Sequence, residues 1–150
     1  MSYRDGIYND YLDEKDDSGY LKVSSSNQES YADNYMDLLP PDTGARILEI
    51  GCGAGQLLYY IRNEGYKNIE GADIGDAQIK LLEKMGIKGS VISSVPSFLK
   101  DKGGQYDLII MNYVIEHFTK EEIWESLRSI RLALKEGGRF VFTTCNMACL

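Results

Sequence analysis

A short glycine-rich segment is the clearest place for chemistry in this sequence. Glu49 is followed by glycines at the alternate positions 51, 53 and 55, with Cys52 between the first two. Glycine lets a turn tighten and lets a ligand approach the backbone closely. An apolar run, residues 46–50, precedes the segment and a helical pattern follows it. The segment is therefore predicted to connect a strand to a helix beside a bound ligand.

The glycine spacing and the acid before it favour one class of cofactor. A dinucleotide-binding loop reads G-x-G-x-x-G, which brings a pyrophosphate to a helix N-terminus. Here the pattern is E-x-G-x-G-x-G, and a carboxylate at Glu49 would repel a pyrophosphate but suit an ammonium or sulfonium group. The sequence therefore favours S-adenosylmethionine over NAD. Asp73 ends a second apolar run, twenty positions after Gly53, where an acid binds ribose hydroxyls in nucleotide-binding folds; a simple turn or helix cap is the alternative.

Strand and helix patterns alternate along the rest of the chain. Strands are expected at residues 46–50, 68–73, 90–93, 106–111 and 139–143. Helices are expected at 27–38, at 56–64, from an Asp76 cap to Gly86, and from a Thr119 capping box with Glu122 to Gly137. The last of these is expected to bury Ile123, Leu127, Ile130 and Leu134.

This alternation predicts an α/β fold, a doubly wound parallel sheet with helices on both faces. Right-handed crossovers favour the strand order 3-2-1-4-5. Ligands bind such sheets at the carboxyl ends of the strands, where the order reverses between the first and fourth strands. Glu49, the glycines and Asp73 all belong to that edge of the sheet.

Residues 46–145 resemble the class I, Rossmann-like S-adenosylmethionine-dependent methyltransferases, and among them the broad small-molecule branch. The matching stretches, in order, are ILEIGCGAG, IEGADI, YDLIIMNYVIEHF and LKEGGRFVFTT. The resemblance implies that the cofactor's methionine end is held by Glu49, Gly51, Cys52, Gly53, Gly55 and Asn112. Asp73 would hold the ribose, and Ile74 would pack on the adenine. Members often have an acid after the third strand to meet the adenine amine; here Ser93, Ser94 and Val95 stand there, and a serine or a backbone group could substitute.

Methyl transfer needs no protein nucleophile, because the acceptor attacks the methyl carbon in line and the protein aligns the two. A base is needed only where the acceptor must lose a proton. His117 is the candidate base, with packing or capping at a helix start as the alternative reading; Glu116 is the second candidate, and Tyr113 could line the acceptor pocket. A single histidine and the cysteines 52, 145 and 149 make neither a metal site nor a disulfide framework.

Charge is unevenly distributed along the chain. The formal net charge is -7, and residues 1–45 hold ten acidic and three basic residues, whereas the remainder is balanced. With no basic stripe, nucleic-acid binding is not expected, and with no long apolar run, neither is a membrane span. The polar N-terminus indicates a cytoplasmic protein. The tyrosine-rich arm within residues 1–26 either packs on its own domain or covers a pocket as a lid.

Taken together, these features predict an acidic, tyrosine-rich arm and helix over residues 1–45 and a methyltransferase domain over residues 46–150. The family's C-terminal helix and strand pair have no counterpart here, so residues 140–145 are expected to form an exposed edge that pairs with a second copy. The expected activity is methylation of a small-molecule acceptor, with O-methylation of a sugar or similar metabolite as the leading hypothesis. A non-catalytic cofactor-binding or interaction domain is the alternative. The acceptor itself is not readable from these residues.

Overall fold

A single parallel sheet forms the centre of the molecule. The computed structural model describes residues 25–145, and within them the strands are β1 (Ile47–Ile50), β2 (Ile69–Asp73), β3 (Lys88–Val91), β4 (Tyr106–Asn112) and β5 (Leu134–Thr143). Their order is β3-β2-β1-β4-β5, and every neighbouring pair is parallel. The predicted fold class and strand order are therefore confirmed.

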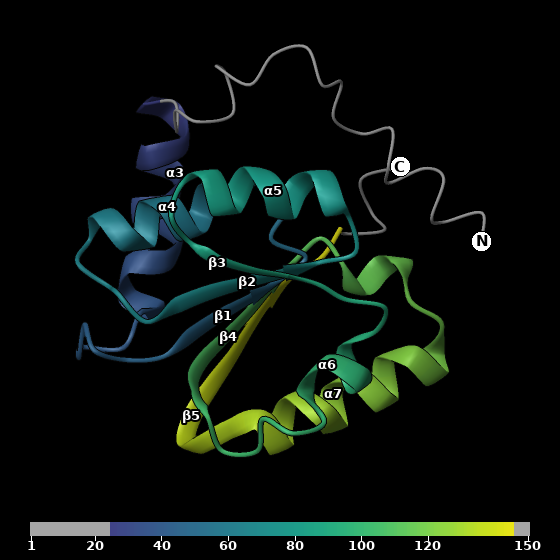
Figure 1. Ribbon diagram of the computed structural model, residues 1–150. Coiled ribbons are helices and arrows are strands. Elements are labelled where there is room, and N and C mark those ends of the chain that lie inside the picture. Colours follow the sequence, from purple (N-terminus) through teal and green to yellow (C-terminus); the bar gives the residue numbers. More distant parts are fainter. Residues whose placement is uncertain (1–24, 146–150) are drawn as a thin grey trace.

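Helices cover both faces of this sheet, as Figure 1 shows. One face carries α3 (Ser25–Tyr35), the short 3-10 helix η1 (Met36–Leu38), α4 (Gln56–Asn63) and α5 (Asp76–Lys84). The other face carries α6 (Val95–Leu99), a second 3-10 turn η2 (Ile115–His117) and α7 (Lys120–Ala133). In the part of the chain that the structure describes, none of these helices combines the length and hydropathy needed to cross a bilayer.

Two apolar cores result, one on each face. Alternate residues of β1 divide between them, because successive side chains of a strand point to opposite faces. Ile47 packs with Leu58 and Leu82 beneath α4 and α5, whereas Leu48 packs with Ile109 and Ile130 beneath α7. Tyr31 and Tyr35 of α3 pack against the first core, so the helix expected at residues 27–38 belongs to the same packed body as the sheet. The remainder of the arm lies outside the described residues.

Two local expectations were wrong on the β3 side of the sheet, and one helix there was not expected. The third strand is Lys88–Val91 rather than residues 90–93, because Lys88 reaches buried Glu70 of β2 and fixes the register two residues earlier. Asp76 is the first residue of α5 and not its cap; Gly75 holds that position. The short helix α6 was not foreseen, although Ser94 followed by a proline signals a helix start.

The last helix also departs from expectation. It opens with the predicted capping box of Thr119 and Glu122, but it ends at Ala133, where Leu134 becomes extended and pairs with Tyr106 of β4. Its buried face is formed by Ser126, Ile130 and Ala133, and Leu127 is 36% exposed. The small side chains let the helix lie close to the sheet, which rotates Leu127 out of the core.

Strand β5 is the edge of the sheet, as expected. It pairs with β4 on one side, and within residues 25–145 no strand lies on its other side. Phe140 and Phe142 stack with ring centroids 5.4 Å apart, and Phe142 is 48% exposed. An apolar edge of this kind is open to pairing with another strand, and association of two copies through it stays a prediction.

Candidate functional site

The glycine-rich loop between β1 and α4 is built by backbone conformations that suit glycine. Gly51 has φ +73° and lies so close to Val114 that an added Cβ would be 2.2 Å from a methyl carbon of that side chain. Gly53 has φ +50°, and a Cβ there would meet nothing within 4 Å. The loop is therefore tight against the protein at Gly51 and open to solvent or ligand at Gly53.

Asp73 fastens this loop to the end of β2. Its carboxylate accepts one hydrogen bond from the backbone N–H of Gly53 at 2.9 Å and another from Gly75 at 2.9 Å. Each bond uses a different oxygen, and a carboxylate oxygen can accept more than one hydrogen bond. Asp73 thus has the turn-capping role that the sequence offered as an alternative. It also lines the neighbouring cavity, and its binding of ribose hydroxyls stays a prediction.

Glu49 is a carboxyl group buried inside the sheet's carboxyl edge. It is 4% exposed, and within the described residues its Oε2 atom is buried with no hydrogen-bond partner. Desolvation by burial raises the pKa of Glu49 to about 8, with a lowering contribution from its hydrogen bond to Asn112 and a raising one from the charge of Asp73. A buried, ionised carboxyl group without a partner is energetically costly. A cationic group bound beside Glu49 would therefore stabilise its ionised form.

Helix α3 closes the space beside Glu49. The Tyr35 hydroxyl donates to Oδ1 of Asn112 at 2.8 Å, and the Thr143 hydroxyl donates to the same oxygen at 3.0 Å. Tyr31 packs on Tyr60 of α4 with ring centroids 5.6 Å apart. Asn112 therefore ties α3, β4 and β5 together at the switch point. The sequence did not identify Tyr31 and Tyr35 as residues of the site. The high frequency of tyrosine in this part of the chain was the feature that could have indicated them.

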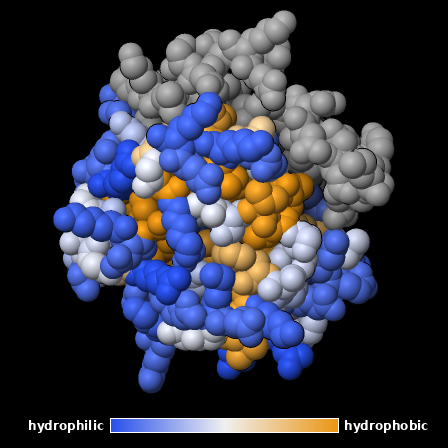
Figure 2. All heavy atoms as spheres, viewed as in Figure 1, coloured by the Kyte–Doolittle hydropathy of each residue, from blue (hydrophilic) through white to orange (hydrophobic). Residues whose placement is uncertain are grey.

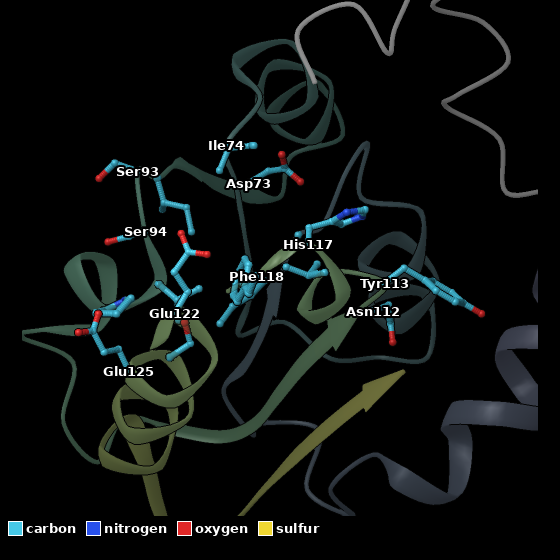
Figure 3. Close-up of a pocket in the computed structure, with 17 residues that line it drawn as sticks. Asp73, Ile74, Ser93, Ser94, Asn112, Tyr113, His117, Phe118, Glu122 and Glu125 are labelled. Carbon is cyan, nitrogen blue, oxygen red and sulfur yellow. The ribbon is translucent and has the colours of Figure 1, made fainter. Parts of the chain in front are cut away.

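A cavity of about 460 Å³ opens at the carboxyl ends of β1, β2 and β4, a size typical of small-ligand sites. Its apolar wall includes Ile74, Ile92, Val95, Pro96 and Phe118. Figure 3 shows Asp73 and Ile74 on one side of this space and Phe118 and His117 across from them. In Figure 2, hydrophobic side chains come to the surface in a band between α5 and α6, framed by hydrophilic ones.

The structure brings most of the predicted site residues together. The cavity is lined by Gly51, Asp73, Ile74, Ser94, Val95, Asn112 and His117. Glu49 lies behind it, joined through Asn112. Cys52 points its side chain into the core, and burial raises the pKa of its thiol, which leaves it protonated and unreactive. Gly55 faces Leu82 of α5 rather than the cavity.

The segment after β4 supplies the candidate reactive side chains. His117 is exposed and belongs to the lining of the cavity. Tyr113 is 62% exposed and adopts φ +54°, a conformation that non-glycine residues seldom take outside functional sites. Glu116 instead accepts hydrogen bonds from Thr144 and Cys145 beside β5, so it holds the end of the edge strand. The described residues contain no cluster of three groups able to ligate a metal.

Comparison with curated proteins finds several methyltransferases that are similar to this chain. The ubiquinone biosynthesis O-methyltransferase of Bordetella avium is 27% identical over 69% of this chain and 44% of its own length. The EEF1A lysine methyltransferase 2 of Danio rerio is 29% identical over 96% of this chain and 67% of its own length. The chain thus spans about half the length of several curated relatives that it matches.

Solved structures and family models agree with the topology. A SAM-dependent methyltransferase from Archaeoglobus fulgidus superposes with a TM-score of 0.68 at 25% identity, covering 80% of this chain and 54% of that protein. The family model described as "Methyltransferase domain" matches residues 24–149, which include every residue that the structure describes. With the parallel sheet in the order β3-β2-β1-β4-β5, the glycine loop and Asp73 in place, this chain belongs to the methyltransferase-domain family.

Proposed function

We propose that this chain is the cofactor-binding and catalytic domain of an S-adenosylmethionine-dependent methyltransferase that acts on a small-molecule acceptor. The observation that carries the proposal is buried Glu49, whose Oε2 atom has no partner among the described residues. A positively charged group of the cofactor would meet that carboxylate. A pyrophosphate would be repelled by it, which disfavours a dinucleotide.

Other residues in and beside the cavity suit the remaining parts of this cofactor. Gly53, beside the cavity lining, leaves open space next to the backbone, and Asp73 has acceptor capacity for ribose hydroxyls beyond its two backbone hydrogen bonds. Ile74, Ile92, Val95 and Phe118 form an apolar slot of the kind that accepts an adenine ring. When bound, the cofactor supplies a methyl group activated by a sulfonium. The protein's part is to hold the acceptor in line with that methyl group and to exclude water.

The acceptor is a proposal at a finer level. O-methylation of a sugar or similar metabolite remains the leading hypothesis. Its support is general: two relatives are named ubiquinone biosynthesis O-methyltransferases. The exposed and strained Tyr113, next to Asn112 and at the rim of the cavity, is suited to contact such an acceptor. A cytoplasmic location belongs to the same proposal.

Titration calorimetry with S-adenosylmethionine, S-adenosylhomocysteine and NAD tests the cofactor assignment. We expect the first two to bind in the micromolar range and NAD not to bind. Asp73→Ala is expected to reduce affinity by about a hundredfold, because it removes a ribose acceptor and releases the N–H of Gly53.

Asp76→Asn is the matched control for this titration. It removes a negative charge three residues away, on an exposed carboxylate paired with Lys80, and is expected to leave affinity unchanged. Binding of NAD in preference to S-adenosylhomocysteine, or equal affinity in the Asp73 variant, would contradict the proposal.

His117 is proposed as the base for acceptors that must lose a proton. His117→Asn is then expected to lower turnover by about a hundredfold with acceptors that must lose a proton, while leaving the affinity for S-adenosylhomocysteine within about twofold. Release of S-adenosylhomocysteine over a range of pH provides the measurement. Unchanged turnover and an unchanged pH profile would assign His117 to packing instead.

A further inference from the structure

The adenine end of the cavity lacks a carboxylate on the strand where one is commonly found. Ser93, Ser94 and Val95 follow β3, and the Ser94 hydroxyl oxygen is used to cap α6 by accepting from the N–H of Ser97 at 3.3 Å. An adenine ring presents an exocyclic amino group, which donates hydrogen bonds and needs an acceptor. A charged acceptor for that amino group would therefore come from another element.

Helix α7 brings two carboxylates to this cavity. Glu122 and Glu125 both belong to its lining. In Figure 3 the side chain of Glu122 rises from α7 into the space between Ser94 and Phe118, whereas that of Glu125 is directed away from it. Asp73 is the third carboxylate of the lining, and its two oxygens already accept the N–H groups of Gly53 and Gly75 at the opposite end.

The capping box fixes the orientation of Glu122. Its Oε2 atom accepts from the backbone N–H of Thr119 at 2.7 Å, and the Thr119 hydroxyl accepts from the N–H of Glu122 at 3.2 Å. These reciprocal bonds hold the carboxylate in one plane at the start of α7. Its second oxygen, Oε1, therefore has a defined direction relative to the cavity.

We propose that Glu122 accepts a hydrogen bond from the exocyclic amino group of adenine and so makes this cavity select an adenine nucleoside over a hypoxanthine one. The inference rests on the proposed S-adenosylmethionine site and adds a specificity residue to it. Hypoxanthine carries a carbonyl oxygen at the same position, so a carboxylate there would repel it. A site that offers an acceptor to a ligand donor discriminates against ligands that lack the donor, and at an exposed residue such as Glu122 this discrimination is modest.

Glu122→Gln tests this role directly, because the capping box determines which way the glutamine amide group is oriented. The N–H of Thr119 selects the glutamine oxygen as its acceptor, which leaves the NH₂ group at the position of Oε1. Glutamine at this helix position preserves the capping box, so the fold is expected to persist, as circular dichroism and thermal unfolding would show. The residue facing the purine changes from an acceptor to a donor.

The measurement is titration calorimetry with S-adenosylhomocysteine and with its hypoxanthine analogue, S-inosylhomocysteine. We expect the wild type to prefer the adenine ligand by about tenfold, the value of one charged hydrogen bond at a partly exposed site. In Glu122→Gln this preference is expected to reverse, through weaker binding of the adenine ligand and tighter binding of the hypoxanthine one. Glu121→Gln, an exposed neighbour outside the cavity lining, removes the same charge and is expected to keep the wild-type preference.

The outcomes separate this inference from the proposal on which it rests. A wild-type preference retained in Glu122→Gln, or a reversal produced by Glu125→Gln instead, overturns the role of Glu122 while leaving the cofactor site intact. Absence of S-adenosylhomocysteine binding to the folded wild type overturns the proposed function itself, and with it this inference.

Discussion

Replacing Glu49 with glutamine is expected to stabilise the protein without cofactor at pH 8 and above, and to weaken its binding of S-adenosylmethionine. Burial raises the pKa of Glu49 to about 8, above the value near 4.3 of an unfolded glutamate. The native state then binds more protons than the unfolded state between these two values, so stability falls as pH rises through that window. Glutamine carries no charge and avoids the penalty, a difference on the order of 5 kcal/mol above pH 8 that vanishes near pH 4.

Urea unfolding of wild type and Glu49→Gln at several pH values from 5 to 9 provides the stability measurement. The cofactor measurement is calorimetry in buffers of different ionisation enthalpy. We expect the wild type to release a proton when S-adenosylmethionine binds near pH 7, because the ligand's positive charge favours the ionised carboxyl group, and the variant to release none and to bind about tenfold to a hundredfold more weakly.

Glu83→Gln is the matched control for Glu49, since Glu83 is exposed on α5. It should leave both the pH dependence of stability and the proton release unchanged. A Glu49 variant whose stability differs from wild type by the same amount at pH 5 and pH 9 would show that the buried group does not titrate in this window. Equal proton release by the two proteins would show that Glu49 is not the group that responds to the cofactor.

Replacing Glu70 with alanine is expected to destabilise the protein by about 3 kcal/mol at pH 7. Glu70 is buried in β2, where its Oε1 accepts from the Tyr106 hydroxyl at 2.9 Å and from Arg46 Nη2 at 2.9 Å, and its Oε2 lies 2.9 Å from Lys88 Nζ. Tyr106 is completely buried. Removing its acceptor therefore leaves a hydroxyl with no partner among these residues, in addition to a cavity.

The pH dependence of this effect runs opposite to that of Glu49. Burial alone would raise the pKa of Glu70, but the hydrogen bonds from Lys88, Arg46 and Tyr106 outweigh it and lower the pKa to about 2. The native state then binds fewer protons than the unfolded state, so this contribution is complete above about pH 4.5 and is lost as pH falls toward 2. Glu70→Ala should therefore differ from wild type less at pH 3 than at pH 7.

Glu70→Gln separates hydrogen bonding from charge in this cluster. Its amide oxygen can still accept from Tyr106, so we expect it to be less destabilising than alanine in urea unfolding. Because Glu70 lies toward the start of β2, away from the cavity lining, affinity for S-adenosylhomocysteine should be unchanged in either variant. A loss of ligand affinity with no loss of stability would contradict a purely structural role.

The fold class and strand order could be predicted from the sequence because the residue patterns that determine them are local. Alternating strand and helix patterns, the capping box at Thr119 and the glycines at 51 and 53 each depend on neighbours within a few residues. Where the local signal was weak, boundaries were misplaced. β3 is half exposed and contains a glycine, and its register depends on the contact of Lys88 with Glu70 of another strand. The end of α7 depends in the same way on Leu134 pairing with β4.

The sequence by itself determined the class of cofactor site, since Glu49, the glycine loop and Asp73 follow strand ends that a parallel sheet must bring together. Only the tertiary structure decided how that site is closed and completed. The Tyr35 hydroxyl contacts Asn112 across 77 positions of sequence. Glu122 reaches the cavity because α7 packs against α6 and β5 with Ser126 and Ile130 on its buried face. Such contacts follow from how whole elements pack, and no local pattern of residue types encodes the angle or the depth of that packing.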